Sequence, residues 1–335
     1  MDNKTLQDLK KEYEIKRQKA LELAEEKKAS LYLTYPKLQE IENELSTLSI
    51  KTAKSILANS ASSEAVDNLK NDIALLKNQK LAYLNSIGIN ESDLAPVFDC
   101  PICNDTGYVN KNGVSSMCNC LKQRVINIEY NKSQLGNLDK ENFETFNLTF
   151  YSDEANFEKY KSKLSPRNNI LRIKSCAEKF IENFDSADEK NLILMGNSGL
   201  GKTFLSNCIA NELLKKGKTV LYQTSPNMLE EIIKYRFDKP GCNKDVVDNL
   251  LNVDLLIIDD LGTETVNSLT STELFNILNS RLLNQTNKIT KTIISTNLTL
   301  QNIYSTYDER ISSRIIGYYT VCKFFGEDIR LKKLK

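Results

Sequence analysis

The chain has no histidine among its 335 residues. This absence excludes acid–base catalysis by imidazole and metal ligation by histidine, so any chemistry must use carboxylates, lysine, arginine or a metal ion. A strong excess of one charge is also missing, because 45 lysines and arginines face 44 aspartates and glutamates, for a net charge of +1. Binding to a nucleic acid would therefore need a local basic patch.

Long apolar runs are absent as well. No stretch approaches the roughly 20 apolar residues that a helix needs to cross a bilayer. The first residues, MDNKTLQDLKKEYEIKR, are polar and of mixed charge, unlike a signal peptide. We therefore expect a cytoplasmic protein with no membrane partner, and its length is sufficient for two domains.

Residues 6–84 contain no glycine and a single proline, Pro36. This Lys/Glu-rich segment predicts helices with a break at Pro36, and the small polar residues of 58–67 predict a turn with Ser63 as a helix N-cap. A narrow apolar stripe must be buried, either within a helical hairpin or against a partner protein. Two such stripes recur at helical spacing, with Lys80 interrupting the second: Leu38, Ile41, Leu45 and Leu48, then Leu69, Ile73, Leu76, Tyr83 and Ile87.

Four of the eight cysteines are clustered, at Cys100, Cys103, Cys118 and Cys120. Two cysteine pairs around a short Gly-containing hairpin favour a four-cysteine zinc ribbon whose metal supplies the folding energy. The second pair is C-x-C rather than the common C-x-x-C, and an iron–sulfur cluster or a redox pair remains an alternative. The other cysteines lie in core-like segments and are interpreted as small hydrophobic residues: Cys176, Cys208, Cys242 and Cys322.

A phosphate-binding loop of the form G-x-x-x-x-G-K-[ST] follows the apolar run 192–195 and precedes helical spacing from Thr203 to Lys216. Strand, loop and helix are the context that this motif requires. Its backbone amides would surround a phosphate, Lys202 would contact the β- and γ-phosphates, and the Thr203 hydroxyl would ligate Mg²⁺. The predicted nucleotide-binding residues are Gly196, Asn197, Ser198, Gly199, Leu200, Gly201, Lys202 and Thr203.

From residue 170 onward, short apolar runs alternate with helical segments. They predict a helix over 170–184 and five strands of a parallel sheet covered on both faces, at 192–195, 219–223, 255–258, 292–295 and 320–325. A connector precedes this core, helical over 121–130 and then irregular. Its aromatic residues would pack on the core or stack on an adenine ring, with packing favoured: Phe143, Phe146, Phe150 and Tyr151.

Polar side chains follow two of the predicted strands. Asp259 and Asp260 come directly after four aliphatic residues, and buried carboxylates there need a cation or a donor network. We assign Asp259 to Mg²⁺ and Asp260 to polarising the attacking water, with Glu264 as a weaker candidate for that base. Asn297 ends the next strand and would bond the γ-phosphate or the water.

Two arginines, Arg310 and Arg314, lie one turn apart on a short predicted helix. Such a pair is usually a solvated face. A nucleotide site without an arginine of its own, however, often receives one from a neighbouring subunit, where the guanidinium neutralises charge in the transition state.

The segments GNSGLGKT, LLIIDDLG, ISTN and DERISSRI, followed by VCKFFGEDIR, resemble the AAA+ ATPases of the bacterial replicative-helicase loader group. This group is of the DnaC/DnaI type and includes transposition helper ATPases of the IstB type. The resemblance covers about residues 142–330. It implies that residues 196–203 form Walker A, Asp259 and Asp260 Walker B, Asn297 sensor 1, and Arg314 the arginine finger, with Arg310 in the same box.

Two departures from the family pattern matter. Most AAA+ proteins carry Glu at the position of Asp260, and the shorter acid would suit slow hydrolysis in a switch. The sequence ends soon after Arg330, so no full lid domain is expected and Arg330 is only a candidate for sensor 2. The helical start and the cysteine cluster resemble the helicase-binding, zinc-containing region of the DnaI-like loaders.

The sequence thus predicts an α/β fold: an AAA+ P-loop core at 166–335, preceded by a helical partner-binding region at 1–95, a zinc module at 96–125 and a connector at 126–165. The resemblance implies an ATPase that uses ATP, Mg²⁺ and Zn²⁺, self-associates through its core, and loads a replicative hexameric helicase onto single-stranded DNA. A transposition helper binding duplex DNA and a transposase is the first alternative. A P-loop kinase and a non-catalytic nucleotide-binding adaptor are further ones.

Overall fold

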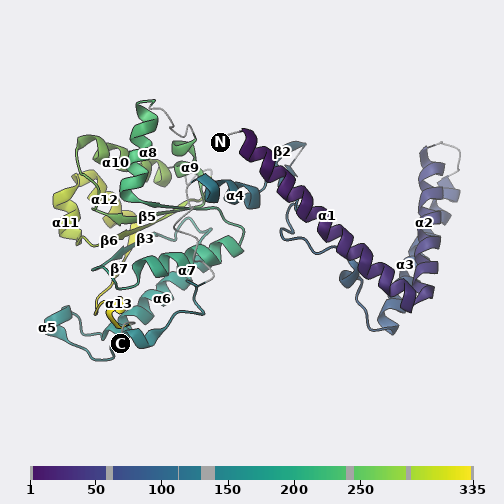
Figure 1. Ribbon diagram of the computed structural model, residues 1–335, viewed down its shortest axis with the longest axis horizontal. Coiled ribbons are helices and arrows are strands. Elements are labelled where there is room, and N and C mark those ends of the chain that lie inside the picture. The colour runs from purple at the N-terminus through teal and green to yellow at the C-terminus, as the bar shows by residue number, and fades with distance from the viewer. Residues whose placement is uncertain are drawn as a thin grey trace. The chain divides into compact units, whose positions relative to one another are not determined.

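The structure, a computed structural model, describes residues 3–57, 63–111, 113–129, 140–238, 245–283 and 288–332. The chain divides into two compact units. We call Gln7–Ser116 the N-terminal unit, and Met1–Leu6 together with Met117–Lys335 the core unit (Figure 1). Among the described residues, no helix combines the length and hydropathy that a membrane span requires.

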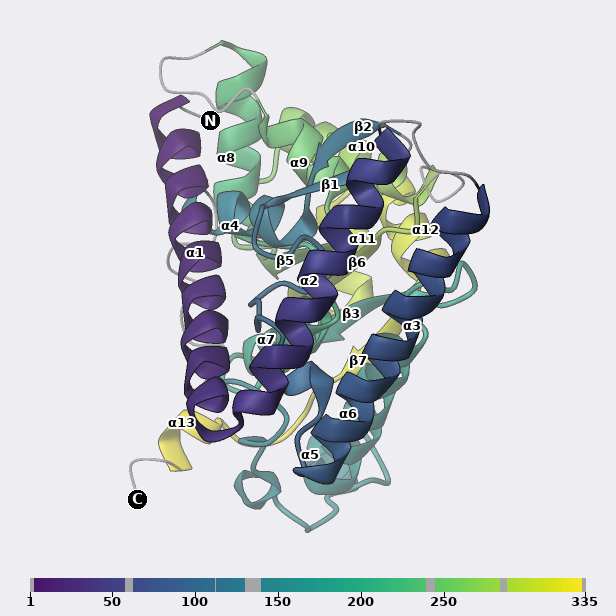
Figure 2. The ribbon, with the colours of Figure 1, turned by 90° about the vertical axis from the view of Figure 1, so that its right-hand side faces the viewer.

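The N-terminal region is helical, as predicted, with α1 (Asn3–Thr34), α2 (Pro36–Leu57) and α3 (Ser63–Ser86). Pro36 is the first residue of α2, where a missing backbone N–H costs no helical hydrogen bond. Helices α2 and α3 pack along each other as a hairpin (Figures 1 and 2). Of the predicted turn at 58–67, residues 58–62 lie outside the described residues, as does the side chain of Ser63, whereas residues 63–67 form the start of α3 rather than a turn.

The hairpin buries the base of its predicted stripes rather than their whole length. Leu38 and Leu84 are at most 1% exposed and pack with Leu94 of the 3-10 helix η1 (Glu91–Leu94). Leu84 was missed by the sequence pattern, which named its neighbour Tyr83. The rest of the second stripe is only half-buried.

Lys80, which interrupts the second stripe, has a partner across the hairpin. Its ammonium lies 2.8 Å from a Glu42 carboxylate oxygen and 3.2 Å from one of Glu91. Tyr32 of α1 donates its hydroxyl to the other Glu42 oxygen. This small polar cluster joins α1, α2, α3 and η1, and it explains why a lysine stands within an apolar stripe.

The cysteine segment contains a two-stranded sheet of β1 (Tyr108–Lys111) and β2 (Val114–Met117), followed by α4 (Asn119–Glu129). The hairpin matches the one expected between the two cysteine pairs. Helix α4 matches the helical start predicted for the connector, within the limits of the described residues, which omit 130–139.

The core unit is built on a parallel sheet of five strands in the spatial order β4-β5-β6-β3-β7. The predicted strands are confirmed to within three residues. They are β3 (Asn191–Met195), β4 (Val220–Thr224), β5 (Leu255–Leu261), β6 (Lys291–Thr296) and β7 (Tyr319–Lys323). Strand β3, which leads into the phosphate-binding loop, lies between β6 and β7, so the loop emerges inside the sheet rather than at an edge.

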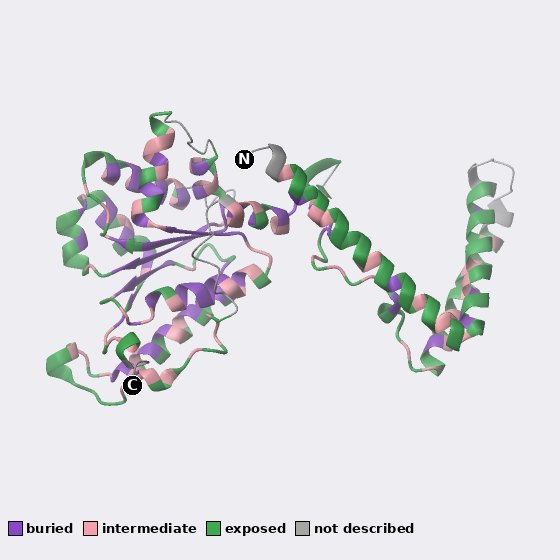
Figure 3. Ribbon diagram, in the orientation of Figure 1, coloured by how far each residue is buried: buried purple, intermediate pink, exposed green. Residues whose placement is uncertain are grey.

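Helices cover both faces of this sheet, as the alternating pattern predicts (Figure 1). On one face lie α6 (Pro166–Glu182) and α7 (Lys202–Lys215). The opposite face is covered by α8 (Ser225–Arg236), α9 (Val246–Asn252), α10 (Ser268–Leu283), α11 (Leu300–Thr306) and α12 (Glu309–Tyr318). Strands β3 to β6 are almost wholly buried between them (Figure 3), whereas the edge strand β7 is only partly buried.

Local sequence signals set the ends of these helices. The Ser165 hydroxyl accepts from the Asn168 backbone N–H at 3.2 Å, and Pro166 occupies the first turn of α6. At α12, the Asp308 carboxylate accepts from the Ile311 N–H at 3.0 Å. Three shorter elements complete the described core: η2 (Leu148–Phe150), α5 (Phe157–Tyr160) and α13 (Ile329–Lys332).

The cysteines outside the cluster behave largely as small hydrophobic residues. Cys208 and Cys322 are buried, and Cys176 is half-buried against the same core. Cys242 lies outside the described residues.

Candidate nucleotide-binding site

The phosphate-binding loop runs from the end of β3 into α7. Gly199 and Gly201 have φ of +77° and +92°, in the left-handed region that glycine adopts without strain. A Cβ on Gly199 would come within 2.0 Å of an Asp328 carboxylate oxygen. The glycines are therefore needed both for the turn and for the close approach of the C-terminal segment.

Lys202, at the start of α7, is 6% exposed and points back into the loop. Its ammonium donates to the carbonyls of Gly196 at 2.6 Å and Asn197 at 2.9 Å, and to the side-chain oxygen of Asn297 at 2.7 Å. Burial lowers the pKa of Lys202, and the carboxylates of Asp260 and Asp259 oppose this shift. The loop lysine and the predicted sensor amide thus meet.

Asp259 is 5% exposed and lies on the sheet face that α7 covers. Three hydroxyl groups donate to its carboxylate: Thr203 of α7 at 3.2 Å, Tyr222 of β4, and Ser295 of β6. Tyr222 and Ser295 are functional neighbours that the sequence interpretation missed. The available signal was a tyrosine within an aliphatic strand, because a buried phenol usually finds a hydrogen-bond partner.

Asp260 differs from Asp259 because the β5 ladder is irregular between Ile258 and Leu261. The bulge turns the Asp260 side chain outward, and its φ of +54° is a left-handed value that Asp and Asn adopt more readily than longer side chains. Its N–H donates to the Ser295 hydroxyl at 3.2 Å. Burial, together with the neighbouring Asp259 charge, raises the pKa of Asp260.

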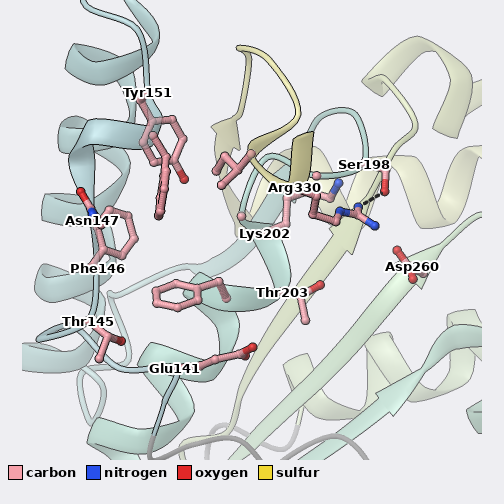
Figure 4. A pocket seen from close by; sticks show the side chains of 15 residues that line it. Glu141, Thr145, Phe146, Asn147, Tyr151, Ser198, Lys202, Thr203, Asp260 and Arg330 are labelled. Atoms are coloured by element: carbon pink, nitrogen blue, oxygen red, sulfur yellow. Dashed lines mark hydrogen bonds between the residues drawn. The ribbon is translucent and has the colours of Figure 1, made fainter. Parts of the chain in front are cut away.

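A pocket of about 480 Å³ opens above the loop, within the ~300–1,000 Å³ range of small-ligand sites. Figure 4 shows Thr203, Asp260 and Arg330 toward one end, and Phe146 and Tyr151 toward the other. The pocket therefore combines a polar end suited to phosphates with an aromatic end.

The connector aromatics do pack on the core, as favoured from the sequence. Phe143, Phe146 and Phe150 lie against the buried cluster under α6 and α7. The Phe146 and Tyr151 rings stack with centroids 6.4 Å apart, and the Tyr151 hydroxyl donates to the Leu200 carbonyl at 3.1 Å. Because Phe146, Phe150 and Tyr151 also line the pocket, packing and contact with a bound base are compatible.

Arg330 is brought to the pocket by the C-terminal segment. The Ile329 N–H donates to the Gly199 carbonyl at 2.9 Å, and the Arg330 guanidinium donates to the Ser198 hydroxyl (Figure 4). This cation comes from α13 and therefore lies at the polar end of the pocket.

Glu264, the weaker candidate for the catalytic base, is not among the residues that line this pocket. Its carboxylate accepts from the Gly262 N–H at 3.0 Å and from the Tyr307 hydroxyl. The two acids thus have different surroundings, and Asp260 is the one at the pocket.

The predicted arginine pair lies on α12, away from the pocket lining. The Arg314 guanidinium donates to the side-chain oxygen of Asn279 at 3.0 Å. The more exposed Arg310 bonds Asp308 at 2.6 Å and lies 4.8 Å from the Phe275 ring centroid. Neither arginine reaches the phosphate-binding loop of its own chain.

The four clustered cysteines come together at one point. The sulfur atoms of Cys100, Cys103, Cys118 and Cys120 all lie within 4.8 Å of one another. Four thiolates around one zinc ion, each at about 2.3 Å, stand roughly 3.8 Å apart. This donor set therefore fits zinc.

Local turns build the cluster. The Asp105 carboxylate accepts from the backbone N–H groups of Asp99 at 2.9 Å and Cys100 at 2.8 Å. The Cys103 carbonyl accepts from the Thr106 hydroxyl at 2.7 Å. The second cysteine pair, by contrast, lies at the start of α4, and the helical turn there accommodates its C-x-C spacing.

A phosphate-binding loop with its lysine, two acids at the end of β5 and an amide at the end of β6, on a five-stranded parallel sheet, defines an ATP-binding P-loop protein of the AAA+ class. The family model described as IstB-like ATP binding protein matches residues 140–333, more than half of the chain. The chain belongs to this family.

Named relatives match shorter parts. The replicative helicase loader DnaC of Escherichia coli K12 is 35% identical over 112 residues, 33% of this chain and 44% of the relative. The chromosomal replication initiator DnaA of Streptococcus agalactiae is 32% identical over 128 residues, 37% of this chain and 26% of the relative. The alignments thus span less than half of either relative.

Two solved structures are similar to the core at low identity. A crystal structure of the DnaC helicase loader shares 22% identity over 53% of this chain and 96% of that chain, with a TM-score of 0.43. AMPPCP-bound DnaA from Aquifex aeolicus shares 22% over 58% of this chain and 55% of that chain, with a TM-score of 0.44.

Proposed function

We propose that this protein hydrolyses ATP and uses the reaction as a release switch while loading a replicative hexameric helicase onto single-stranded DNA. The observation that carries the ATPase part is the meeting of Lys202 with Asn297, 2.7 Å apart, beside Thr203 and Asp259, 3.2 Å apart. Lys202 and Thr203 belong to the phosphate-binding loop and line the pocket, and each contacts a side chain from the end of a different neighbouring strand, Asn297 after β6 and Asp259 on β5.

The residues of the site divide the chemistry among them. Lys202 exchanges its carbonyl partners for the β- and γ-phosphates of ATP. Asp260 polarises the water that attacks the γ-phosphorus, and Asn297 orients that water or the γ-phosphate without adding charge. Arg330, at the Ser198 end of the pocket, is placed to contact a phosphate oxygen, and the aromatic end receives the base.

The Thr203 hydroxyl and the Asp259 carboxylate lie 3.2 Å apart and offer oxygen ligands. Mg²⁺ is the cofactor that fits them, because it is a hard cation that prefers oxygen. Thr203 would ligate the ion directly, and Asp259 would hold it directly or through water. When bound, Mg²⁺ neutralises charge on the phosphates. For Zn²⁺ we propose the four clustered cysteines, as a structural site that stabilises residues 96–125.

The pocket needs a second subunit under this proposal. Arg314 does not reach its own loop but donates to Asn279, which leaves its guanidinium near the surface of α12. We assign it to the pocket of a neighbouring copy, with Arg310 as part of the same surface. Self-association through the core unit would then be required for hydrolysis.

The part of the chain before the ATPase core favours the loader over a transposition helper. Three helices precede a four-cysteine cluster, and this combination resembles the partner-binding region of DnaI-like loaders. Exposed apolar residues on α1, α2 and α3 supply docking surface for a helicase: Ile15, Leu23, Leu33, Ile50 and Leu75. The helper function remains the second candidate because the family model carries the IstB name.

The full-length protein tests this proposal with the replicative helicase of its own source organism. We expect a stable complex of the two, and ATP-dependent placement of the helicase on circular single-stranded DNA, read out as unwinding of an annealed strand. Lys202→Ala should retain the complex but lose the placement.

Contrary results point to the rivals. Failure to bind the helicase, with ATP hydrolysis stimulated by duplex DNA, would favour the transposition helper. A kinase would be favoured if a strictly monomeric protein hydrolysed ATP or transferred its phosphoryl group to a small molecule. Nucleotide binding without turnover under any condition would leave an adaptor.

A further inference from the structure

Tyr222 is the largest polar side chain around the acids of the site, and it belongs to no motif of the phosphate-binding class. It lies in the middle of β4, is 1% exposed, and pairs in register with Ile257 of β5. Because side chains alternate along a strand, Ile257 and Asp259 share one face of the sheet. Tyr222 is therefore on the same face as Asp259.

Ser295 reaches this face from the other side. It pairs in register with Leu194 of β3, and it follows Ile293 by two residues on β6. Asp259 thus lies on β5 between a tyrosine on β4 and a serine on β6, with α7 above. The sheet order β4-β5-β6 is what brings the three side chains together.

The hydrogen bonds are directional. Tyr222 donates to Asp259 Oδ2, the oxygen that also accepts from Thr203, whereas Ser295 donates to Oδ1. One donor on each oxygen from two different strands fixes the rotation of the carboxylate about its Cβ–Cγ bond. Thr203 alone, with a single contact at 3.2 Å, would leave that rotation free.

We propose that Tyr222 and Ser295 are positioning residues that orient the Asp259 carboxylate for the divalent cation of the nucleotide. This inference rests on the proposed ATP site. Neither hydroxyl lines the pocket, so their effect passes through Asp259. Groups that orient a metal ligand in this way typically contribute 10- to 100-fold in metal affinity.

Metal binding gives a readout that does not depend on turnover. Mn²⁺ replaces Mg²⁺ as the probe, and its binding to the full-length protein saturated with ADP is followed by electron paramagnetic resonance. Tyr222→Phe keeps the ring and removes the hydroxyl, and Ser295→Ala removes the other donor. We expect each to weaken Mn²⁺ binding about 10-fold, while ADP affinity without metal stays at the wild-type value.

Tyr319→Phe is the matched control, because Tyr319 is also buried, at 4% exposure, but lies on β7, which β6 and β3 separate from the Asp259 strand β5. It should bind Mn²⁺ like the wild type. In an Asp259→Asn background, Tyr222→Phe should cause no further loss, since the carboxylate that it orients is already gone.

Mn²⁺ affinity unchanged in both Tyr222→Phe and Ser295→Ala would overturn the inference, as would an equal loss in Tyr319→Phe. If one variant does not fold, the other carries the same test.

A wild-type protein that binds Mn²⁺–ADP but never hydrolyses ATP would refute the proposed function, while the shift in Mn²⁺ affinity would still support the positioning role. At saturating Mg²⁺, hydrolysis by folded Tyr222→Phe protein should return toward the wild-type rate.

Discussion

The ammonium of Lys202 and the side-chain oxygen of Asn297 lie 2.7 Å apart, although the residues are 95 positions apart in the chain. The contact follows from the topology, because β3 and β6 are neighbouring parallel strands whose carboxyl ends meet at one edge of the sheet. In this arrangement, neutral oxygens hold the lysine in place. Under the proposed function, a triphosphate would displace these oxygens from Lys202, and the same event would free the side chain of Asn297.

Replacing Lys202 with Ala removes the side chain that joins the loop carbonyls to Asn297. We expect hydrolysis to fall on the order of 10²–10³-fold, as when a preorganised donor to transition-state charge is lost, and ATP binding to weaken. Steady-state phosphate release and binding of a fluorescent ATP analogue measure the two effects.

Lys215→Ala is the control, since this exposed lysine of the same helix pairs only with Glu212 among the ion pairs described. It should hydrolyse ATP like the wild type. Full activity in Lys202→Ala protein would mean that the pocket above the loop is not the catalytic one.

Asp260 offers a second test. Its φ of +54° is left-handed, so one substitution can remove the carboxylate without adding backbone strain, and another can add strain while keeping the carboxylate. Asp260→Asn should keep ATP binding and the fold, since Asn also tolerates left-handed conformations, but lose hydrolysis by about 10²–10⁴-fold. Asp260→Glu retains a carboxylate. It should lower the free energy of unfolding by about 1 kcal/mol, because glutamate adopts a left-handed backbone conformation less readily than aspartate or asparagine.

Thermal unfolding and phosphate release of the two variants check this. Equal stability of both, together with normal turnover by the Asn variant, would remove Asp260 as the base. Glu264 would not readily replace it as the base, since its carboxylate already accepts hydrogen bonds from the Tyr307 hydroxyl and the Gly262 N–H.

Much of the fold could be predicted because the local patterns are strong. The strands are short aliphatic runs between helical segments, and each was located to within three residues. The phosphate-binding loop and Asp259–Asp260 were found because their spacing in the chain is fixed by a local backbone geometry. The sequence also predicted the cysteine cluster, since its two pairs are only 20 residues apart from first to last.

What the sequence could not reveal depends on pairing between distant segments. Tyr222 and Ser295 become neighbours of Asp259 only through the strand order, which no local pattern specifies. The contact of Arg330 with Ser198 requires the path of the chain after β7. In the helical hairpin, the apolar pattern of the sequence predicted that Tyr83 is buried. The buried side chain is that of the next residue, Leu84.

The cysteine cluster predicts one zinc per chain by elemental analysis of reduced protein. Cys103→Ser should lower the zinc content and destabilise residues 96–125 to proteolysis, because a segment of this size has no core of its own. Cys208→Ser, which changes a buried cysteine outside the cluster, should keep its zinc. A wild-type protein carrying iron or no metal would contradict the zinc assignment.

Asp254 predicts a pH-dependent contribution to stability. Burial disfavours its charge, but hydrogen bonds from Lys288 and from the Thr219 N–H and hydroxyl outweigh this and lower its pKa. A folded-state pKa below the unfolded value of about 3.9 stabilises the protein above that pH, and the effect is lost as the pH falls through the folded pKa.

Asp254→Asn should therefore lower the free energy of unfolding at pH 7 on the order of 1 kcal/mol, a value kept small because Lys288 is half-exposed. Denaturant titrations at pH 7 and near pH 3 compare the variant with the wild type. The difference should shrink at the lower pH; a constant difference would show that charge is not its cause.

Arg314 gives the sharpest test of a shared site, because its guanidinium bonds Asn279 and does not line its own pocket. Arg314→Ala should leave ATP binding intact and lower hydrolysis on the order of 10³-fold, the lower end of the effect of an arginine finger. Lys202→Ala protein is equally inactive but still carries Arg314. Mixing the two variants therefore creates interfaces in which an intact pocket faces an intact arginine, and activity should return in proportion to them.

Arg236→Ala, which removes an arginine paired with Glu273 on the same side of the sheet, should need no such rescue. An Arg314→Ala protein that stays inactive at every mixing ratio, while still assembling with the Lys202→Ala partner, would argue against a finger supplied in trans.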